Sequence, residues 1–322
     1  MQRTIARAVV IGSGTMGGGI AAHFANAGIP VFLLDVSQPI VKASLDRLKK
    51  NTPPAFATPQ TAELVTIGNL DQNESWIGEG DWIIEAIVEN LDAKRELVAR
   101  IDRLRKKGSI VSSNTSGIPT AKLPATASDD FRAHFLGTHF FNPPRYMKLL
   151  EVIPTPDTLP DVTAFVREFA ETRLGKSVVL CKDTPNFIAN RLASMGGASL
   201  VDFALANHYT VEETDLIAGP LTGRPKTAAF RLQDLVGFDV SSAVASNLYP
   251  LIEGDESREV LLSPRVEVLR VSQTEKGRLG DKTKQGFYKK DGKQILSLDL
   301  ETGEYRERIV PSIPSLAEAA KI

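Results

Sequence analysis

Residues 8–35, AVVIGSGTMGGGIAAHFANAGIPVFLLD, contain the pattern that decides the fold of the N-terminal half. Residues 8–11 are uniformly apolar, which is typical of a strand covered on both faces in a parallel sheet. A glycine-rich turn follows at once, and apolar residues then recur at helical spacing over 20–27, up to Gly28, where we expect the helix to end. Residues 31–35 form a second apolar run that ends in an aspartate. The stretch therefore predicts a strand, a glycine turn, a helix and a second strand.

The turn reads Gly12-Ser13-Gly14-Thr15-Met16-Gly17, and its three glycines suit a dinucleotide. Gly12 permits a tight turn, Gly14 lets the backbone approach a pyrophosphate, and Gly17 allows close packing of helix on strand. The helix N-terminus would offer the phosphates free N–H groups and its positive dipole end. The alternative is a glycine-rich turn that binds nothing. Because every element occurs in the expected order, we favour a dinucleotide site, with Thr15 and Met16 as part of it.

Asp35 indicates which dinucleotide is bound. It follows Gly12 at close to the ~20 residues at which an acid reaches the hydroxyls of the adenosine ribose. A carboxylate at the 2′-oxygen would repel the 2′-phosphate of NADP, and the next residues, Val36, Ser37 and Gln38, offer no arginine to reverse that preference. We therefore expect NAD.

Composition and charge exclude several classes of protein. The chain has 322 residues, with 38 Lys+Arg against 39 Asp+Glu, so it lacks the positive field of non-specific nucleic-acid binders. Its single cysteine, Cys181, cannot form an internal disulfide and is too few for a zinc site, so we expect no metal and a reducing cytoplasm. No apolar run approaches the ~20 residues of a membrane span, so we expect no membrane partner.

Strand and helix patterns alternate through the first half of the chain. We expect strands at 81–86 and 109–113, a surface helix at 91–106, and a loop or broken helix at 49–59. Strands that alternate with helices imply an α/β fold with a doubly wound parallel sheet of the Rossmann type.

The length predicts two domains. After residue 182 the strand signals fade and helical spacing dominates, so we expect the first domain over 1–182 and a smaller, mostly helical domain over 183–322. Asn190 falls on the first helix of that second domain. We expect the active site in the cleft between the domains, where pockets prefer to form.

His139 is the histidine with chemically useful neighbours. Of the histidines at 23, 134, 139 and 208, only His139 has polar residues at strand ends on either side, since 137–144 are expected to follow a strand. Glu151 lies in an apolar run at 149–153, where an unpartnered carboxylate is costly. If Glu151 accepts a hydrogen bond from one ring nitrogen, the other nitrogen is free to take a hydroxyl proton, as a dehydrogenase requires. A buried histidine paired with an acid for structural reasons is the alternative.

Six segments between residues 8 and 288 resemble one enzyme family. They are GSGTMGGGIAAHFANAGIPVFLLD, IIEAIVENLDAKRE, SNTSGIP, GTHFFNPPRYMKLLEVIPTPDT, GKSVVLCKDTPNFIANR and LGDKTKQGFY. The family is that of the L-3-hydroxyacyl-CoA dehydrogenases of fatty-acid β-oxidation. The resemblance implies an enzyme that oxidises an L-3-hydroxyacyl-CoA thioester to the 3-oxoacyl-CoA with NAD.

The resemblance also implies roles for single residues. His139 corresponds to the catalytic base and Glu151 to its orienting acid. Asn190 looks like the residue that hydrogen-bonds the substrate oxygen, and Ser116 like the one that touches the substrate carbonyl region and the nicotinamide end. Without the resemblance, Asn190 would read as a helix-interior asparagine and Ser116 as a turn serine.

For NAD, the family pattern adds four residues to Asp35 and the glycine turn: Glu89, Lys94, Asn142 and Lys282. Lys282 is similar to a lysine that reaches the cofactor from the second domain. Glu89 and Lys94 could equally be solvated helix charges.

The chain departs from the family pattern in three places. A proline-rich stretch replaces the usual basic helical excursion after Lys49-Lys50, which leaves the CoA contacts unidentified. Asn186 stands where a glycine is usual, and Lys226-Thr227-Ala228-Ala229 replaces a proline-glycine-proline turn. These features look most like the dehydrogenase part of bifunctional proteins that carry an enoyl-CoA hydratase part further along. We therefore expect a fragment or a shortened relative, truncated after the helix start at 315–322.

Two other functions stay open. The fold could serve a crystallin-like structural protein that binds NAD, or a dehydrogenase of a hydroxy acid or sugar acid without CoA. The resemblance also suggests a homodimer formed through the helical domain.

Overall fold

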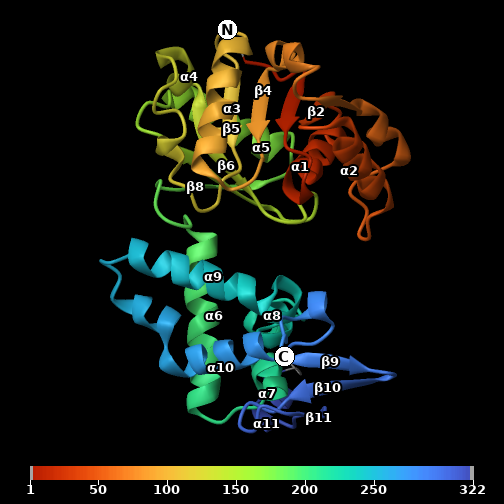
Figure 1. Ribbon diagram of the computed structural model, residues 1–322, viewed down its shortest axis with the longest axis vertical. Coiled ribbons are helices and arrows are strands. Elements are labelled where there is room, and N and C mark those ends of the chain that lie inside the picture. Colours follow the sequence, from red (N-terminus) through yellow and green to blue (C-terminus); the bar gives the residue numbers. More distant parts are fainter. Residues whose placement is uncertain (1–2, 320–322) are drawn as a thin grey trace. The chain divides into compact units, whose positions relative to one another are not determined.

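The computed structural model describes residues 3–319, which form two compact units. The N-terminal unit ends at Ile188 and the C-terminal unit begins at Ala189. The expected boundary after residue 182 falls in the loop that precedes this division. Figure 1 shows a sheet flanked by helices in the first unit and mainly helices in the second.

The N-terminal unit is built on one sheet of eight strands, in the order β3-β2-β1-β4-β5-β6-β7-β8. The strands are β1 (Ala8–Ile11), β2 (Val31–Asp35), β3 (Val65–Asn69), β4 (Trp82–Glu85), β5 (Ile110–Ser113), β6 (Phe135–Phe140), β7 (Leu149–Pro154) and β8 (Ser177–Leu180). β1 to β6 are all parallel, whereas β7 is antiparallel to β6. β8 is parallel to β7.

The expected doubly wound sheet of the Rossmann type is confirmed, and it is parallel except that β7 and β8 run antiparallel to the other six strands. The link 141–148 between β6 and β7 is too short for the crossover of a dozen or more residues that a parallel connection needs, so the chain turns back. The expectation that 137–144 follow a strand is wrong in part, because β6 extends to Phe140 and contains His139.

Helices cover both faces of this sheet. They are α1 (Thr15–Asn26), α2 (Gln38–Lys50), α3 (Leu91–Leu104), α4 (Asp129–Ala133) and α5 (Pro160–Thr172). Residues of β1 alternate between two cores: Ala8 and Val10 join the core under α1 and α2, and Val9 and Ile11 join the core under α3. The uniformly apolar run at 8–11 is therefore buried on both faces, as expected.

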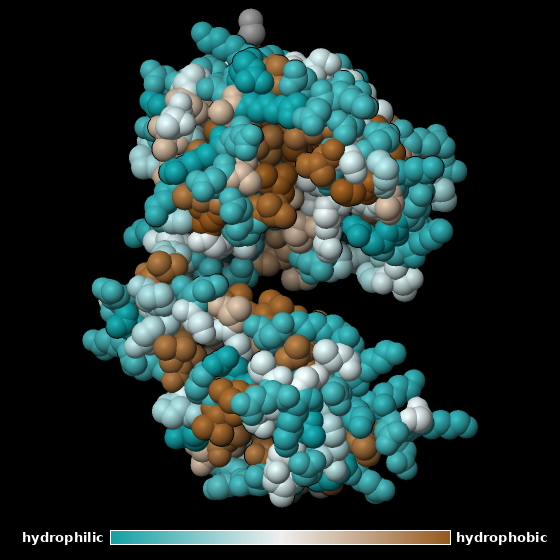
Figure 2. Space-filling view, viewed as in Figure 1, coloured by the Kyte–Doolittle hydropathy of each residue, from teal (hydrophilic) through white to brown (hydrophobic). Residues whose placement is uncertain are grey.

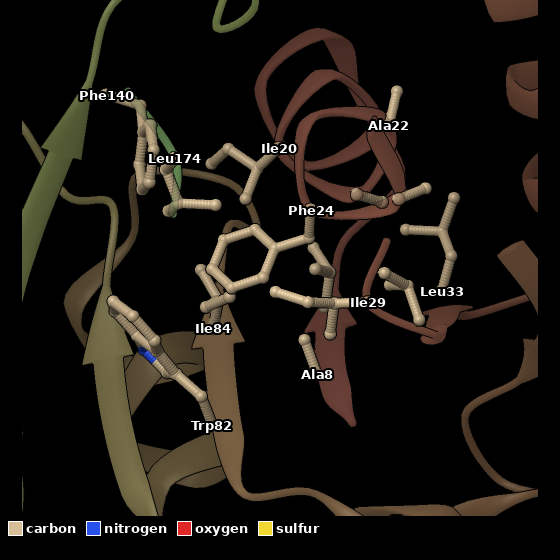
Figure 3. Close-up of a cluster of buried hydrophobic side chains, with 14 of the residues drawn as sticks. Ala8, Ile20, Ala22, Phe24, Ile29, Leu33, Trp82, Ile84, Phe140 and Leu174 are labelled. Atoms are coloured by element: carbon tan, nitrogen blue, oxygen red, sulfur yellow. The ribbon is translucent and has the colours of Figure 1, made fainter. Parts of the chain in front are cut away.

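The first core is organised around aromatic rings (Figure 3). Phe24 of α1 points toward Trp82 and Ile84 of β4, and the Phe24 and Trp82 ring centroids are 5.4 Å apart in an edge-to-face arrangement. This packing holds α1 firmly against the sheet. The glycine turn that joins β1 to α1 is therefore anchored at both ends.

The C-terminal unit is mostly helical, as expected. Its helices are α6 (Ala189–Ala206), α7 (Val211–Ile217), α8 (Phe230–Val236), α9 (Phe238–Leu248), α10 (Pro264–Glu275) and α11 (Pro314–Ala319). Phe230, Phe238 and Phe287 form the centre of its core. The helix start expected at 315–322 is observed as α11, and its last three residues lie outside the described part of the chain.

This unit also contains a small antiparallel sheet that its sequence did not predict. It comprises β9 (Tyr288–Asp291), β10 (Gln294–Leu298) and β11 (Tyr305–Glu307), in the order β11-β10-β9. Its β9–β10 hairpin turns at Gly292, whose φ of 57° is left-handed. Among residues 3–319, no helix is both long and apolar enough to cross a membrane.

Candidate active site

His139 and Glu151 face each other across the β6–β7 pair. The ladder register places the two residues directly opposite, so both side chains lie on the same face of the sheet. His139 Nδ1 lies 2.7 Å from Glu151 Oε2, and the two residues are only 5% and 1% exposed. The hydrogen bond that the sequence predicted between these two side chains is therefore formed. It joins a ring nitrogen of the imidazole to a carboxylate oxygen.

Other groups also contact the Glu151 carboxylate. The backbone N–H of Ile188 donates to Oε1 at 3.0 Å. Cys181 lies against the same carboxylate, and burial, together with the charge and hydrogen bond of Glu151, raises the pKa of its thiol to about 12. The thiol therefore stays protonated, and its Sγ lies 3.7 Å from the Val179 carbonyl oxygen, to which it donates. Sequence reasoning missed the contact with Glu151, because nothing in the pattern links Cys181 to that residue.

Two aromatic rings pack on His139. The ring centroids of Phe141 and Phe187 lie 4.5 and 5.6 Å from that of the imidazole. Phe187 reaches this position through a bend in which Asn186 and Phe187 both have positive φ, 58° and 48°. Asparagine tolerates this conformation better than most residues, which explains how Asn186 can stand where the family pattern has glycine.

The glycine turn has the geometry of a phosphate-binding loop. A Cβ on Gly12 would lie 2.4 Å from the Ala86 carbonyl oxygen, and one on Gly17 would lie 1.8 Å from the oxygen of Gly12, so neither position accepts a side chain. A Cβ on Gly14, by contrast, would meet nothing within 4 Å. Gly14 caps α1 without any side-chain hydrogen bond, so the first N–H groups of the helix are open to a pyrophosphate. Thr15 and Met16 begin the helix beside them.

Asp35, at the end of β2, is fixed beside this turn. Its Oδ2 accepts hydrogen bonds from the backbone N–H and the hydroxyl of Ser13, both at 2.6 Å, and its Oδ1 accepts from Val36 N–H at 2.7 Å. A carboxylate has about four acceptor positions, so it can still accept from ribose hydroxyls. The residues of the turn and Asp35 thus fit NAD. The part of Ser13 in orienting the acid was not predicted.

Glu89 holds the turn that contains Ser116. Its Oε1 accepts hydrogen bonds from Thr115 Oγ1 at 2.6 Å and from the backbone N–H groups of Ser116 and Gly117 at 3.0 and 2.8 Å. Although burial opposes it, these donors and the charge of Lys94 lower the pKa of Glu89. The carboxylate thus fixes the backbone on which Ser116 sits.

The ammonium group of Lys94 is buried. Its Nζ lies 2.6 Å from Glu85 Oε1 and 3.2 Å from Glu89 Oε2, and its side chain is 1% exposed. The alternative of solvated helix charges is therefore wrong for Lys94. Its Nζ also donates to the Ile87 carbonyl oxygen at 3.4 Å, and through the two acids it supports the Glu89 turn.

The remaining predicted residues are Asn142 in the N-terminal unit and Asn190 and Lys282 in the C-terminal unit. Asn142 is exposed just beyond β6. In the C-terminal unit, Lys282 pairs with Asp239 at 2.6 Å. Asn190 is the second residue of α6, as expected, and lines a cavity of about 280 Å³ with apolar walls that include Val201 and Phe238.

Comparison with known proteins accounts for both units. The family model for the NAD binding domain of 3-hydroxyacyl-CoA dehydrogenase matches residues 7–184, and the model for the C-terminal domain of the same enzyme matches 187–290.

Relatives and solved structures agree with these matches. A probable 3-hydroxyacyl-CoA dehydrogenase of Bacillus subtilis is 46% identical over all of this chain, but the chain spans only 43% of that protein. One of Deinococcus radiodurans is 43% identical, with 89% of this chain and 83% of the relative covered. The crystal structure of FadB2 from Mycobacterium tuberculosis has a TM-score of 0.76 at 30% identity, covering 89% of this chain and all of that one. On these grounds the chain belongs to the NAD-dependent 3-hydroxyacyl-CoA dehydrogenase family, and the unit that carries His139 and Glu151 is its NAD-binding domain.

Proposed function

We propose that this chain interconverts an L-3-hydroxyacyl-CoA and the 3-oxoacyl-CoA, with His139 as the base and Glu151 as its orienting acid. The observation that supports this most strongly is the buried His139–Glu151 contact at 2.7 Å. β6 and β1 run parallel in the same sheet, so their carboxyl ends lie on the same side of it. His139 is the second-last residue of β6, and the glycine turn follows the last residue of β1. Both therefore lie at the carboxyl ends of the strands. Ligands of such sheets bind outside these ends.

The roles of the two ring nitrogens follow from the contact. The Nδ1–H group keeps its proton and donates a hydrogen bond to Glu151, which leaves Nε2 as an acceptor for the proton of the 3-hydroxyl group. When Nε2 takes that proton, the ring becomes positive and the adjacent carboxylate stabilises it. A positioned base of this kind typically contributes 10²–10⁴-fold to the rate.

The other residues position the reactants. NAD, when bound, supplies the acceptor for the hydride that leaves the carbon bearing the hydroxyl. Gly12–Gly17 and Asp35 would hold its phosphates and ribose, with Asn142 and Lys282 as further contacts. Glu89 keeps the Ser116 backbone in place, and Asn190 donates to the substrate oxygen in this proposal.

We further propose a role in fatty-acid β-oxidation in the cytoplasm, with the helical unit forming a homodimer. The chain spans 43% of the length of the B. subtilis relative.

Replacing His139 by Gln tests the assignment. We expect NADH oxidation driven by acetoacetyl-CoA to fall by at least 10²-fold, whereas NADH binding measured by fluorescence stays within twofold. His208→Gln is the matched control, because His208 is exposed and pairs with Glu301 in the C-terminal unit. Unchanged turnover in His139→Gln contradicts the proposal. Faster oxidation of free 3-hydroxybutyrate than of its CoA thioester would favour a hydroxy-acid dehydrogenase, and no activity with either would favour a crystallin-like protein.

A further inference from the structure

The C-terminal unit contains a hollow of about 950 Å³ that no part of the proposed reaction uses. α7, the loop around Lys226, the start of α8, the β9–β10 hairpin and residues 308–311 surround it. We name this site the basic hollow. Its size lies at the upper end of the ~300–1,000 Å³ that is typical of small-molecule pockets.

The three acidic groups in the wall of the basic hollow all have partners, and two of them are paired with arginines. Glu212 accepts both guanidinium N–H groups of Arg306, at 2.8 and 2.9 Å. Asp281 is paired in the same two-pronged way with Arg231, at 2.6 and 2.9 Å. A third acid, Asp215, accepts the Tyr288 hydroxyl at 2.7 Å. The charges of Glu212 and Asp281 are therefore balanced by arginines, whereas Asp215 is hydrogen-bonded to a neutral hydroxyl.

Most of the cationic groups that line the hollow, in contrast, are not paired with an acid among residues 3–319. Five of them line the hollow, and within residues 3–319 no carboxylate lies within ion-pair distance of any of them: Lys226, Lys284, Lys289, Lys290 and Arg308. Two approach only aromatic rings, with Lys289 5.3 Å from the Tyr305 centroid and Arg308 5.8 Å from that of Tyr288. Like charges gathered around a concave wall focus their field into it and attract anions.

Apolar side chains complete the wall. Ile295, Ile309 and Val310 line the hollow and are 49%, 42% and 93% exposed. Figure 2 shows that the protruding β9–β10 hairpin is otherwise mainly hydrophilic. Exposed apolar side chains next to unpaired cations suit a ligand that has both an apolar part and an anionic part. A purely ionic ligand would leave this apolar wall uncovered, and a purely apolar one would leave the cations unpaired.

We propose that the basic hollow binds a small amphiphilic anion, a molecule with a phosphate or carboxylate head on an apolar body. Two sources share this chemistry: a CoA thioester with a medium-length acyl chain, and the corresponding free fatty acid. The proposal does not depend on the activity proposed above, because every residue of the hollow belongs to the C-terminal unit and none is assigned to the reaction.

The test uses 1-anilinonaphthalene-8-sulfonate, a fluorescent amphiphilic anion, with the full chain under saturating NADH. We expect the double variant Lys284→Glu/Arg308→Glu to raise the Kd of this probe at least tenfold. Lys293→Glu is the control, since Lys293 is an exposed lysine of the same hairpin that does not line the hollow. The control should change the Kd by less than twofold. The proposal is overturned if the double variant and Lys293→Glu bind the probe with the same Kd, whether or not that Kd differs from the wild-type value.

Competition identifies the source of the ligand. Displacement of the probe by decanoyl-CoA but not by decanoate supports a CoA thioester, and displacement by decanoate supports a free acid. Failure of both to displace it overturns the proposal. Turnover of acetoacetyl-CoA should be equal in the wild type and the double variant, which separates this outcome from a failure of the proposed reaction.

Discussion

Replacing Glu151 by Gln removes the charge next to the catalytic imidazole while keeping the size of the side chain. The charges of a protonated His139 and of Glu151 would lie about 4 Å apart, and at an effective dielectric constant of about 20 their attraction is about 4 kcal/mol. At ~1.4 kcal/mol per tenfold, and with part of the interaction kept by the amide dipole, we expect kcat to fall by about 10²–10³-fold. NADH oxidation with saturating acetoacetyl-CoA measures this value, and NADH fluorescence measures cofactor binding, which should not change.

A double-mutant cycle separates this effect from a general disturbance of the fold. If Glu151 acts through His139, the variant Glu151→Gln/His139→Gln should be no slower than His139→Gln alone. A loss of less than tenfold in Glu151→Gln, or additive losses in the double variant, would refute the reasoning.

Three other predictions concern the cofactor, the Ser116 turn and acid stability. Asp35→Asn should lower the ratio of kcat/KM with NAD to that with NADP by about tenfold, because it removes a charge-assisted hydrogen bond worth ~1.5–3 kcal/mol; an unchanged ratio contradicts this. Glu89→Gln turns one acceptor into a donor that faces N–H groups, so hydrogen exchange at 115–118 should quicken and kcat/KM should fall about tenfold; unaltered exchange would rule this out. Burial lowers the pKa of His23 to about 4 from its ordinary 6.5, so the neutral ring stabilises the fold fully above pH 6.5 and this contribution is lost toward pH 4. His23→Leu should therefore flatten the fall of the free energy of unfolding over that range, as measured by urea titration, and a parallel fall in both proteins would count against it.

The first βαβ unit was predictable because its apolar runs, its glycine turn and the glycine that ends its helix all indicate the same elements. The apolar runs at 8–11 and 31–35 become β1 and β2 at those bounds, and Gly28 ends the helix region with a φ of 79°. The direction of β7 was not readable in the same way, because an apolar strand has the same composition in either direction. The length of the preceding link decides it. The small sheet of β9 to β11 was not predicted because its strands are only three to five residues long, and two of them, β9 and β11, carry charged residues that are typical of a solvated surface.

The candidate site was predictable where burial forces a partnership. Glu151 in an apolar run requires a nearby donor, and His139 was the best one available. The contact of Cys181 with Glu151 and the hold of Glu89 on the Ser116 turn could not be predicted. The first is a long-range packing detail, and the second depends on backbone N–H groups, which every non-proline residue possesses.

The direct opposition of His139 and Glu151 in the β6–β7 ladder has a consequence for how this protein tolerates insertions. Five consecutive residue pairs, from Leu136↔Pro154 to Phe140↔Leu150, set their alignment. Lengthening the connecting segment at 141–148 would leave the base and its acid together, since the segment only bridges strands that are already aligned. One extra residue within β7, before Glu151, would instead turn the carboxylate to the opposite side of the sheet.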